Sequence, residues 1–305
     1  MWQRMLGASF GAVLALGLAS PVAQATGASA TEACTAGVGG VTAAGGHTSR
    51  TVTATAPPAI NTGGTTAGAF TPGKVRLTSH WESYPKSGAG SVNTGYVIIG
   101  DSLYSAGYAT NGLDELEGPV HYTRIGGGWS KFSLIEWATY DTVEAGDVAR
   151  TEFYALRNDG VLFRWHVTGK GWQATGSYAG FSAVKTMAVI SKRPTYDTFL
   201  ANTKGGALYT IRIPVTSPMK PVVKQVRTRS WQGFETLVAN RCGQYGTVLL
   251  GIDKDTKTGY LYAVGHANGT STVINSLGKV EGGTFGDPVD FRWSGVSYYD
   301  YLNGE

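Results

Sequence analysis

The sequence has little charge and few cysteines, and each shortage excludes a class of protein. Asp, Glu, Lys and Arg make up 15% of the 305 residues, against about a quarter in an average globular domain. Disordered, coiled-coil and helix-rich cytosolic proteins depend on charge or on long helix-forming side chains, so these classes are excluded. Two cysteines are too few for a fold that disulfides hold together.

The sequence also lacks charge runs, long apolar segments after the N-terminus and known catalytic motifs. The net charge is +4 and no run of five or more like charges occurs, which predicts no nucleic-acid partner. No segment after the N-terminus has the length of apolar sequence that a stable membrane insertion needs. The zincin, nucleophile-elbow and P-loop motifs are absent, and the histidines lack metal-ligand spacing. The sequence therefore predicts no catalytic residue, metal or cofactor, and it favours a non-catalytic protein.

Residues 1–25 match the three parts of a secretory signal peptide. Arg4 precedes the apolar run Met5–Ala19, and Ala23-Gln24-Ala25 is a small-x-small cleavage site. We predict a secreted, extracellular protein, with a retained anchor as the alternative. Because an extracellular setting permits disulfides, Cys34 and Cys242 are predicted to pair, and two free thiols are the alternative.

Residues 26–73 differ in composition from the rest of the chain. Gly, Ala and Thr supply 33 of the 48 residues, and Phe70 is the one aromatic residue. Such a stretch offers little apolar area to offset the entropy lost on ordering. We predict a flexible linker here, within which the alternation Thr51–Thr55 is compatible with one strand.

From Lys74 onward a short unit recurs. It consists of an apolar strand, a tight turn and a second strand that begins with a Leu-aromatic pair. Asp159-Gly160 and Gly205-Gly206 are typical of hairpin turns, which need a positive φ. The copies span residues 96–104, 153–163, 199–209 and 249–262, with the leucine at positions 103, 162, 208 and 261. The steps between these leucines are therefore 59, 46 and 53 residues.

A second unit lies between these hairpins. It combines a Trp with nearby glycine and a following Phe. Its copies are Gly128-Trp129-Ser130-Lys131-Phe132, Gly171-Trp172 with Gly180-Phe181, Trp231-Gln232-Gly233-Phe234, and a degenerate Gly282-Gly283-Thr284-Phe285 that lacks the Trp. A repeat of about 50 residues with three or four strands has the size of a propeller blade. Residues 74–305 thus predict an all-β fold, a β-propeller of five blades, with Val289–Trp293 completing the first blade. A two-sheet sandwich is the alternative.

The units around Trp129-Ser130-Lys131-Phe132 and Phe153–Phe163 resemble blades of the tachylectin-2-type propeller lectins. The resemblance covers roughly residues 95–290. It implies a five-bladed propeller that binds N-acetylated sugars in pockets repeated between blades, without catalysis. The repeats of this chain are less regular than those of that family.

A sugar site needs an aromatic platform and a few fixed hydrogen-bonding groups. The predicted platforms are Trp129, Trp172 and Trp231, and packing between blades is the alternative role for these residues. The predicted polar contacts are Asn158, Asp159 and Asn202, for which plain turn formation is the alternative.

Three hypotheses for function follow from these patterns. The first is a secreted, non-catalytic, lectin-like propeller that binds a glycan or another cell-surface ligand. The second is a propeller that hydrolyses or lyses a polysaccharide with two carboxylates brought together at a central channel. The third is a protein-binding or structural propeller. The sequence does not give the oligomeric state.

Overall fold

The computed structural model describes residues 33–141, 149–295 and 301–305. The predicted signal peptide, residues 1–25, and residues 26–32 of the predicted linker lie outside the described residues. The described residues belong to one compact unit, Ala33–Glu305.

Three of the sheets in this unit have four antiparallel strands each, in simple sequence order. The first holds β8 (Phe132–Tyr140), β9 (Arg150–Arg157), β10 (Leu162–Thr168) and β11 (Gly171–Tyr178). The second holds β12 (Val184–Lys192), β13 (Tyr196–Thr203), β14 (Leu208–Pro214) and β15 (Val222–Arg227). The third holds β16 (Thr236–Cys242), β17 (Gly246–Asp253), β18 (Thr258–Val264) and β19 (Ile274–Lys279).

The fourth sheet has eight strands in the order β3-β2-β1-β20-β4-β5-β6-β7. The strands from the start of the unit are β1 (Thr35–Val41), β2 (His47–Thr53) and β3 (Ala59–Thr66), and β20 (Val289–Ser294) comes from its end. The others are β4 (Val75–Pro85), β5 (Ser91–Ile99), β6 (Ser102–Thr110) and β7 (His121–Gly127). Only two parallel pairs, Trp293 with Trp81 and Ser294 with Glu82, join β20 to β4, so this sheet divides into two groups of four.

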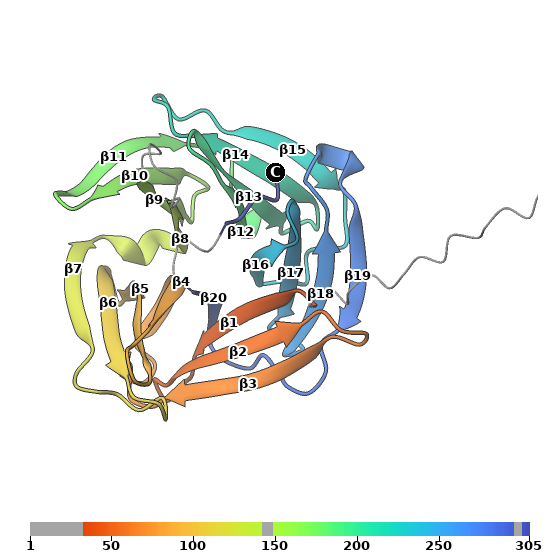
Figure 1. The fold of residues 1–305 in the computed structure, drawn as a ribbon. Helices are drawn as coiled ribbons and strands as arrows, with labels where there is room; N and C mark the ends of the chain where they lie inside the picture. Colours follow the sequence, from red (N-terminus) through yellow and green to blue (C-terminus); the bar gives the residue numbers. More distant parts are fainter. Residues whose placement is uncertain (1–32, 142–148, 296–300) are drawn as a thin grey trace, which may run out of the picture. The chain divides into compact units, whose positions relative to one another are not determined.

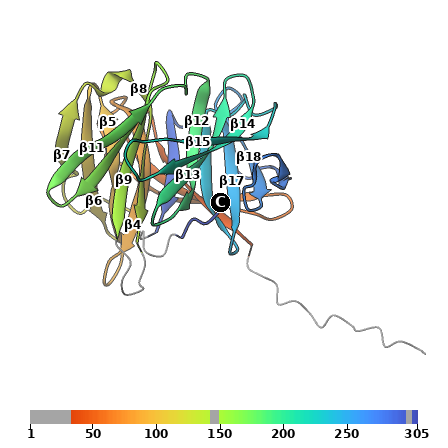
Figure 2. The same ribbon diagram turned by 90° about the horizontal axis from the view of Figure 1, so that it is seen from above.

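The described strands therefore form five groups of four, which lie around a common centre in Figure 1. The innermost strands are β4, β8, β12, β16 and β20, and Figure 2 shows the strands running between two opposite faces. Short 3-10 turns at Trp129–Lys131 and Gly269–Ser271 are the helical elements among the described residues. This architecture confirms the predicted β-propeller and excludes the two-sheet sandwich.

The predicted hairpins correspond to the second and third strands of four groups. The leucine of each Leu-aromatic pair, at positions 103, 162, 208 and 261, is fully buried. Gly160 and Gly206 have φ of 84° and 91°, as the hairpin prediction requires. Side-chain packing between neighbouring groups buries these leucines and accounts for their recurrence.

The prediction of a flexible linker is wrong for the described residues 33–73. Three strands, β1 to β3, occupy most of this stretch, and Val52 and Phe70 are buried. β1 pairs with β20 from Val38↔Arg292 to Val41↔Val289. β20 therefore completes a group with β1, β2 and β3, whereas we expected it to complete the blade that begins after Lys74.

One backbone hydrogen bond recurs after every group of four strands. An aromatic residue in the connection to the next group donates its N–H to a carbonyl in the turn between the second and third strands. The pairs are Phe70 to Gly45 (2.8 Å), Trp129 to Asp101 (3.0 Å), Phe181 to Gly160 (2.9 Å), Trp231 to Gly206 (3.0 Å) and Phe285 to Lys257 (3.0 Å). We call these five residues the anchor aromatics. The rings are all buried, with at most 7% of any residue exposed.

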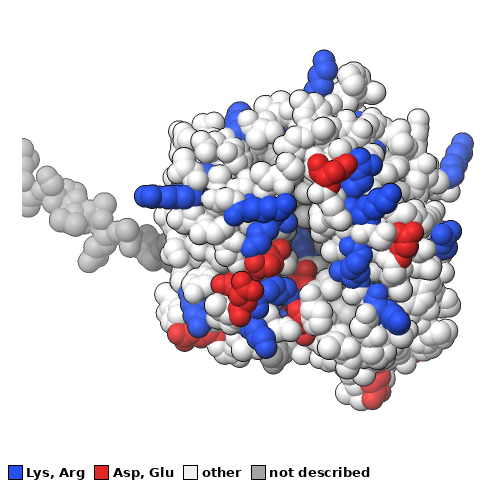
Figure 3. Space-filling view, turned by 180° about the vertical axis from the view of Figure 1, so that it is seen from behind, with Lys and Arg blue, Asp and Glu red and all other residues white. Residues whose placement is uncertain are grey.

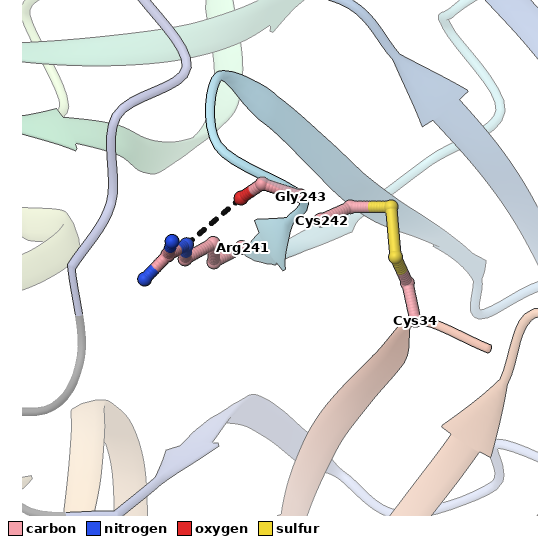
Figure 4. Close-up of a disulfide and its surroundings, with 4 residues drawn as sticks. All are labelled: Cys34, Arg241, Cys242 and Gly243. Carbon is pink, nitrogen blue, oxygen red and sulfur yellow. Dashed lines mark hydrogen bonds between the residues drawn. A yellow bond between two sulfur atoms is a disulfide. The ribbon is translucent and has the colours of Figure 1, made fainter. Parts of the chain in front are cut away.

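A disulfide joins the start of the unit to a distant strand. Cys34 precedes β1 and Cys242 ends β16, and Figure 4 shows the bond between their sulfur atoms. Their Cα atoms are 5.3 Å apart. Beside the bridge, Arg241 Nε donates to the carbonyl of Gly243 (2.8 Å). The predicted Cys34–Cys242 pairing is confirmed.

Reduction of this disulfide should lower the melting temperature. The bridge closes a loop with a sequence separation of 208 residues, and loops of this size give disulfides worth about 2–5 kcal/mol. For a domain of this size the expected fall in Tm is roughly 5–15 °C. Calorimetry with and without reductant measures it directly, because the chain has no other cysteines. An unchanged Tm would contradict the stabilising role.

His47 is a buried, neutral imidazole between two groups of strands. It is 1% exposed, and its Nδ1 lies 2.5 Å from the hydroxyl oxygen of Tyr108. The rings around it belong to Phe70, Trp81, Tyr108, Phe291 and Trp293. Burial lowers the pKa of His47 to about 3.

This histidine should make stability depend on pH. An unfolded histidine has a pKa of about 6.5. Below that pH His47 is therefore protonated in the unfolded chain but stays neutral in the folded protein. Above pH 6.5 His47 is neutral in both states and does not lower the free energy of unfolding. As the pH drops from 6.5 towards 3, this residue lowers the free energy of unfolding by about 1.4 kcal/mol per pH unit. Urea unfolding should show about 2 kcal/mol less stability at pH 5 than at pH 7 from this residue. His47→Phe should remove that difference, and an unchanged pH dependence in the variant would contradict the assignment.

Candidate functional site

A pocket of about 330 Å³ lies where the innermost strands meet. Its walls come from β4, β8, β12, β16 and β20, so residues from every group of strands line it. Figure 3 shows the face turned away from the viewer in Figure 1, with a hollow at its centre and charged side chains around it. We call this space the central pocket.

Six charged residues line the central pocket in equal numbers of each sign. The cations are Arg76, Lys254 and Arg292, and the carboxylates are Glu136, Glu235 and Asp290. Lys254 pairs with Asp290, and its backbone N–H donates to Glu235 Oε2 (2.8 Å). Glu235 also pairs with Lys185. The lining thus carries no net charge.

Glu136 is an ionised carboxylate held in place by β4 and by its own strand. Its Oε1 lies 2.5 Å from His80 Nδ1 and accepts the N–H of Trp137 (2.9 Å). The His80 ring stacks on Trp137 at 4.8 Å. Burial opposes the charge of Glu136, but the charges of His80 and Arg292 and these hydrogen bonds outweigh it and lower the pKa of Glu136. The side chain is 14% exposed, towards the pocket that it lines.

The pKa of Asp290 is displaced in the opposite direction to that of Glu136. Its side chain is fully buried, with Lys254 on one oxygen and Arg50 Nη2 at 3.0 Å from the other. Burial raises the pKa of Asp290, and the attraction of Lys254 and Arg50 only partly offsets it. Two carboxyl groups of the central pocket therefore have pKa values displaced in opposite directions.

A second pocket, of about 300 Å³, lies between the β8–β11 and β12–β15 sheets. Its lining includes Ser133, Asn158, Phe181, Lys185 and Lys204. Ser133 also lines the central pocket, so the two spaces adjoin. We call this space the inter-sheet pocket.

Two of the predicted aromatic platforms are packed side chains. Trp129 is 7% exposed and Trp231 is 6% exposed. Trp129 packs on Phe132 (4.8 Å between ring centroids), and Trp231 packs on Tyr262 (4.8 Å). Both are anchor aromatics, so they have the alternative role, which is packing between blades.

Trp172 is not equivalent to the other two tryptophans. It lies in β11, and its ring packs on Phe153 (4.6 Å) and on Tyr96 of the neighbouring sheet (5.4 Å). The residue at the equivalent position in its group is Phe181. The ring is half-buried, and its role in ligand binding stays a prediction.

Of the three predicted polar contacts, one is buried and two are exposed. Asn202 is fully buried, and its amide donates to the carbonyls of Trp231 (2.7 Å) and Phe234 (2.9 Å), which leaves no donor for a ligand. Asn158 is exposed and lines the inter-sheet pocket. Asp159 is bound by Arg157 (2.6 Å), so its role as a ligand contact stays a prediction.

Sequence reasoning missed the residues of the central pocket. Glu136, which lines the pocket, and His80, which holds it, carry no motif, and they meet only because β4 and β8 are both innermost strands. Within the described ranges no group of three or more His, Cys, Asp or Glu side chains could hold a metal ion. Nor does that part of the chain contain a helix with the length and apolar character needed to cross a membrane.

Comparisons with known proteins give neighbours in structure and none in sequence. No family model matches the chain, and no curated protein matches it. A structure of the lectin from Aleuria aurantia bound to alpha-methyl-L-fucoside has a TM-score of 0.41 and 9% identity, over 66% of this chain and 64% of that one. The match thus spans slightly less than two thirds of that lectin structure.

Two further solved structures are similar at the same level. The fucose-specific lectin from Aleuria aurantia, in a mercury-derivative form, has a TM-score of 0.46 and 13% identity, over 81% of this chain and 80% of that one. The catalytic domain of an alpha-L-arabinofuranosidase from Coprinopsis cinerea has a TM-score of 0.42 and 10% identity, over 71% of this chain and 73% of that one. At these scores it is the strand arrangement described above, and not the likeness to these structures, that defines the fold.

Proposed function

We propose that this chain is a carbohydrate-binding β-propeller that holds a neutral, polyhydroxylated ligand in the central pocket without catalysis. The observation that carries the proposal is the balanced set of cations and carboxylates around that pocket. A sugar hydroxyl both donates and accepts hydrogen bonds, carboxylates only accept, and Lys and Arg only donate. A lining with both kinds of group and no net charge suits such a ligand better than an ion.

Size and rigidity support the same ligand class. A volume of about 330 Å³ is at the small end of the range for ligand sites, about 300–1,000 Å³. Glu136 is already fixed by His80 and Trp137, and Asp290 is fixed by Lys254 and Arg50. Side chains that are ordered before binding lose little entropy when a ligand arrives.

A glycan array, followed by calorimetric titration of the best neutral glycan, tests this proposal. Glu136→Gln should weaken binding at least tenfold, because a charge-assisted hydrogen bond is worth about 1.5–3 kcal/mol. Glu235→Gln should weaken it as well, while Glu117→Gln, outside the pocket and 44% exposed, should bind as the parent does. If no neutral glycan binds, or if both pocket variants retain full affinity, the proposal is wrong.

We also propose secretion and five blades. The pattern of a signal peptide in residues 1–25 and a disulfide, which persists in oxidising compartments, support secretion. The recurrence of the anchor-aromatic hydrogen bond after five groups of strands supports the blade count. Mass spectrometry of the exported protein would test the cleavage after Ala25, and recovery of the chain with residues 1–25 intact would contradict it.

Hydrolysis of a glycosidic bond is a second candidate function. The opposite pKa displacements of Glu136 and Asp290 in one pocket favour it, because pairs of this kind mark acid and base roles in enzymes. Release of reducing sugars from a polysaccharide panel, lowered at least a hundredfold by Glu136→Gln, would support this candidate. Binding with no turnover would leave the non-catalytic function.

A further inference from the structure

The inter-sheet pocket has polar groups at its rim and an apolar base. Leu156, Phe181 and Val184 contribute apolar surface, and Asn158 and Lys204 come from two hairpin turns. Lys204 Nζ donates to the carbonyl of Ser182 (3.0 Å). An ammonium has three donors, so this contact leaves two for a ligand.

The pocket has an excess of positive charge. Its basic residues are Arg157, Lys185 and Lys204, and no carboxylate is part of the lining. Asp159 neutralises Arg157, and Glu235 neutralises Lys185. Within the described residues no salt bridge neutralises Lys204. Its one side-chain hydrogen bond within those residues is to the neutral carbonyl of Ser182, so its charge is free to pair with an anion.

The equivalent connection between the β4–β7 and β8–β11 sheets holds a carboxylate at the corresponding position. There the chain supplies its own anion, since Asp101 accepts the N–H groups of Gly128 (2.9 Å) and Ser130 (2.8 Å). Hydrogen bonds from the Ser130 side chain and backbone, and from Gly128, lower the pKa of Asp101 to about 2. N–H groups on either side of an anchor aromatic thus stabilise a carboxylate.

The inter-sheet pocket lacks this internal anion. The anchor aromatic is Phe181, so the N–H groups that correspond to those of Gly128 and Ser130 belong to Gly180 and Ser182. The turn residue that corresponds to Asp101 is Gly160, which has no side chain to reach them. No protein group among the described residues accepts the N–H of Gly180 or Ser182. Both residues are exposed at the surface.

We propose that the inter-sheet pocket binds the acidic group of a carbohydrate, a carboxylate or a sulfate, through Lys204, Asn158 and the N–H of Ser182. This inference rests on the proposed function, because the adjoining central pocket would hold a neutral unit of the same ligand. The contacts that join the two spaces are the shared Ser133 and the ion pair between Lys185 and Glu235. The ligand class is therefore an acidic oligosaccharide.

Calorimetric titration of the full chain against three matched oligosaccharides tests the inference. One carries a uronate, the second is its carboxyl-reduced neutral counterpart, and the third carries a sulfate in place of the carboxylate. The parent protein should bind at least one acidic form about tenfold more tightly than the neutral form, and the preference should shrink as salt rises. The acidic form that binds more tightly shows which of the two groups the pocket prefers.

Variants of the pocket lysine make the test specific. Lys204→Gln should lower affinity for the acidic form about tenfold and leave the neutral form unchanged. Lys204→Arg, which keeps the charge, should retain the preference, and Lys170→Gln, an exposed lysine in another turn, should have no effect. Equal binding of acidic and neutral forms by the parent, or an unchanged preference in Lys204→Gln, would overturn the inference.

A second readout separates this inference from the proposed function. Glucuronate and inorganic sulfate, titrated alone, should shift the amide resonances of Gly180 and Ser182, and Lys204→Gln should weaken that response. Anion binding here without any neutral glycan binding would refute the central-pocket proposal and retain the anion site. Neutral glycan binding with no response at these amides would refute the anion site alone.

Discussion

A chain that starts at residue 74 should not fold cooperatively, whereas a chain that starts at residue 33 should. The shorter chain lacks β1, β2 and β3, and β20 loses its antiparallel partner. It also lacks Cys34 and the anchor aromatic Phe70. Buried apolar surface on β17 and β20 would be exposed to water, at a cost of about 25 cal/mol per Å².

Circular dichroism and calorimetry of the two chains measure this effect. The 33–305 chain should show one cooperative transition, and the 74–305 chain should show either no transition or a broad one. Cooperative unfolding of the 74–305 chain within a few degrees of the longer chain would restore the linker interpretation of residues 33–73.

Trp231→Ala should cost about 3–5 kcal/mol of stability, because truncation of a buried tryptophan leaves a cavity that its neighbours fill only in part. The ring packs on Phe234 and Tyr262 and is 6% exposed. The expected fall in Tm is roughly 6–15 °C. Leu113→Ala is the control, because Leu113 is 77% exposed and such a change should cost less than about 0.5 kcal/mol.

The same variant separates packing from recognition. If Trp231 only anchors one sheet to the next, the folded fraction of Trp231→Ala should bind neutral glycans with the parent affinity at low temperature. An unchanged Tm together with lost glycan binding would instead support the original prediction of an aromatic platform.

The hairpins could be predicted from sequence because their signals are local. A turn that needs a positive φ favours glycine, and Gly160 and Gly206 mark such turns. Burial of the following strand favours a leucine, as at Leu162 and Leu208. Both signals lie within about ten residues, so no knowledge of distant contacts is needed.

The strands of residues 33–73 could not be predicted from composition, because their glycines serve close packing. A Cβ on Gly39 would lie 2.1 Å from the Phe291 ring, and one on Gly37 would lie 2.2 Å from the carbonyl oxygen of Trp293. The absence of side chains therefore lets β20 approach β1 closely. A composition rich in small residues resembles a linker until the partner strand, some 250 residues away in sequence, is known.

The sequence pattern aligns Trp172 with Trp129 and Trp231, although Trp172 lies one element earlier, in β11. Phe181, rather than Trp172, is the anchor aromatic of its group. In all five groups the anchor aromatic follows the residue that supplies the turn carbonyl by 21 to 28 residues. A search of the sequence for either Phe or Trp at this spacing would therefore find all five anchor aromatics.

The central pocket has no comparable local signal. Arg76, in β4, and Arg292, in β20, line the same space although more than 200 residues separate them in sequence. They meet because β20 joins β1 to close the ring of sheets. Residues assembled by closure can be found only once the strand order is known.

A crystal structure with the best neutral glycan from the array is the most direct test of the central claim. We predict sugar density in the central pocket, with hydroxyl groups within hydrogen-bond distance of Glu136 and Arg292. Density confined to another surface, with the central pocket unoccupied at saturating glycan, would contradict the account.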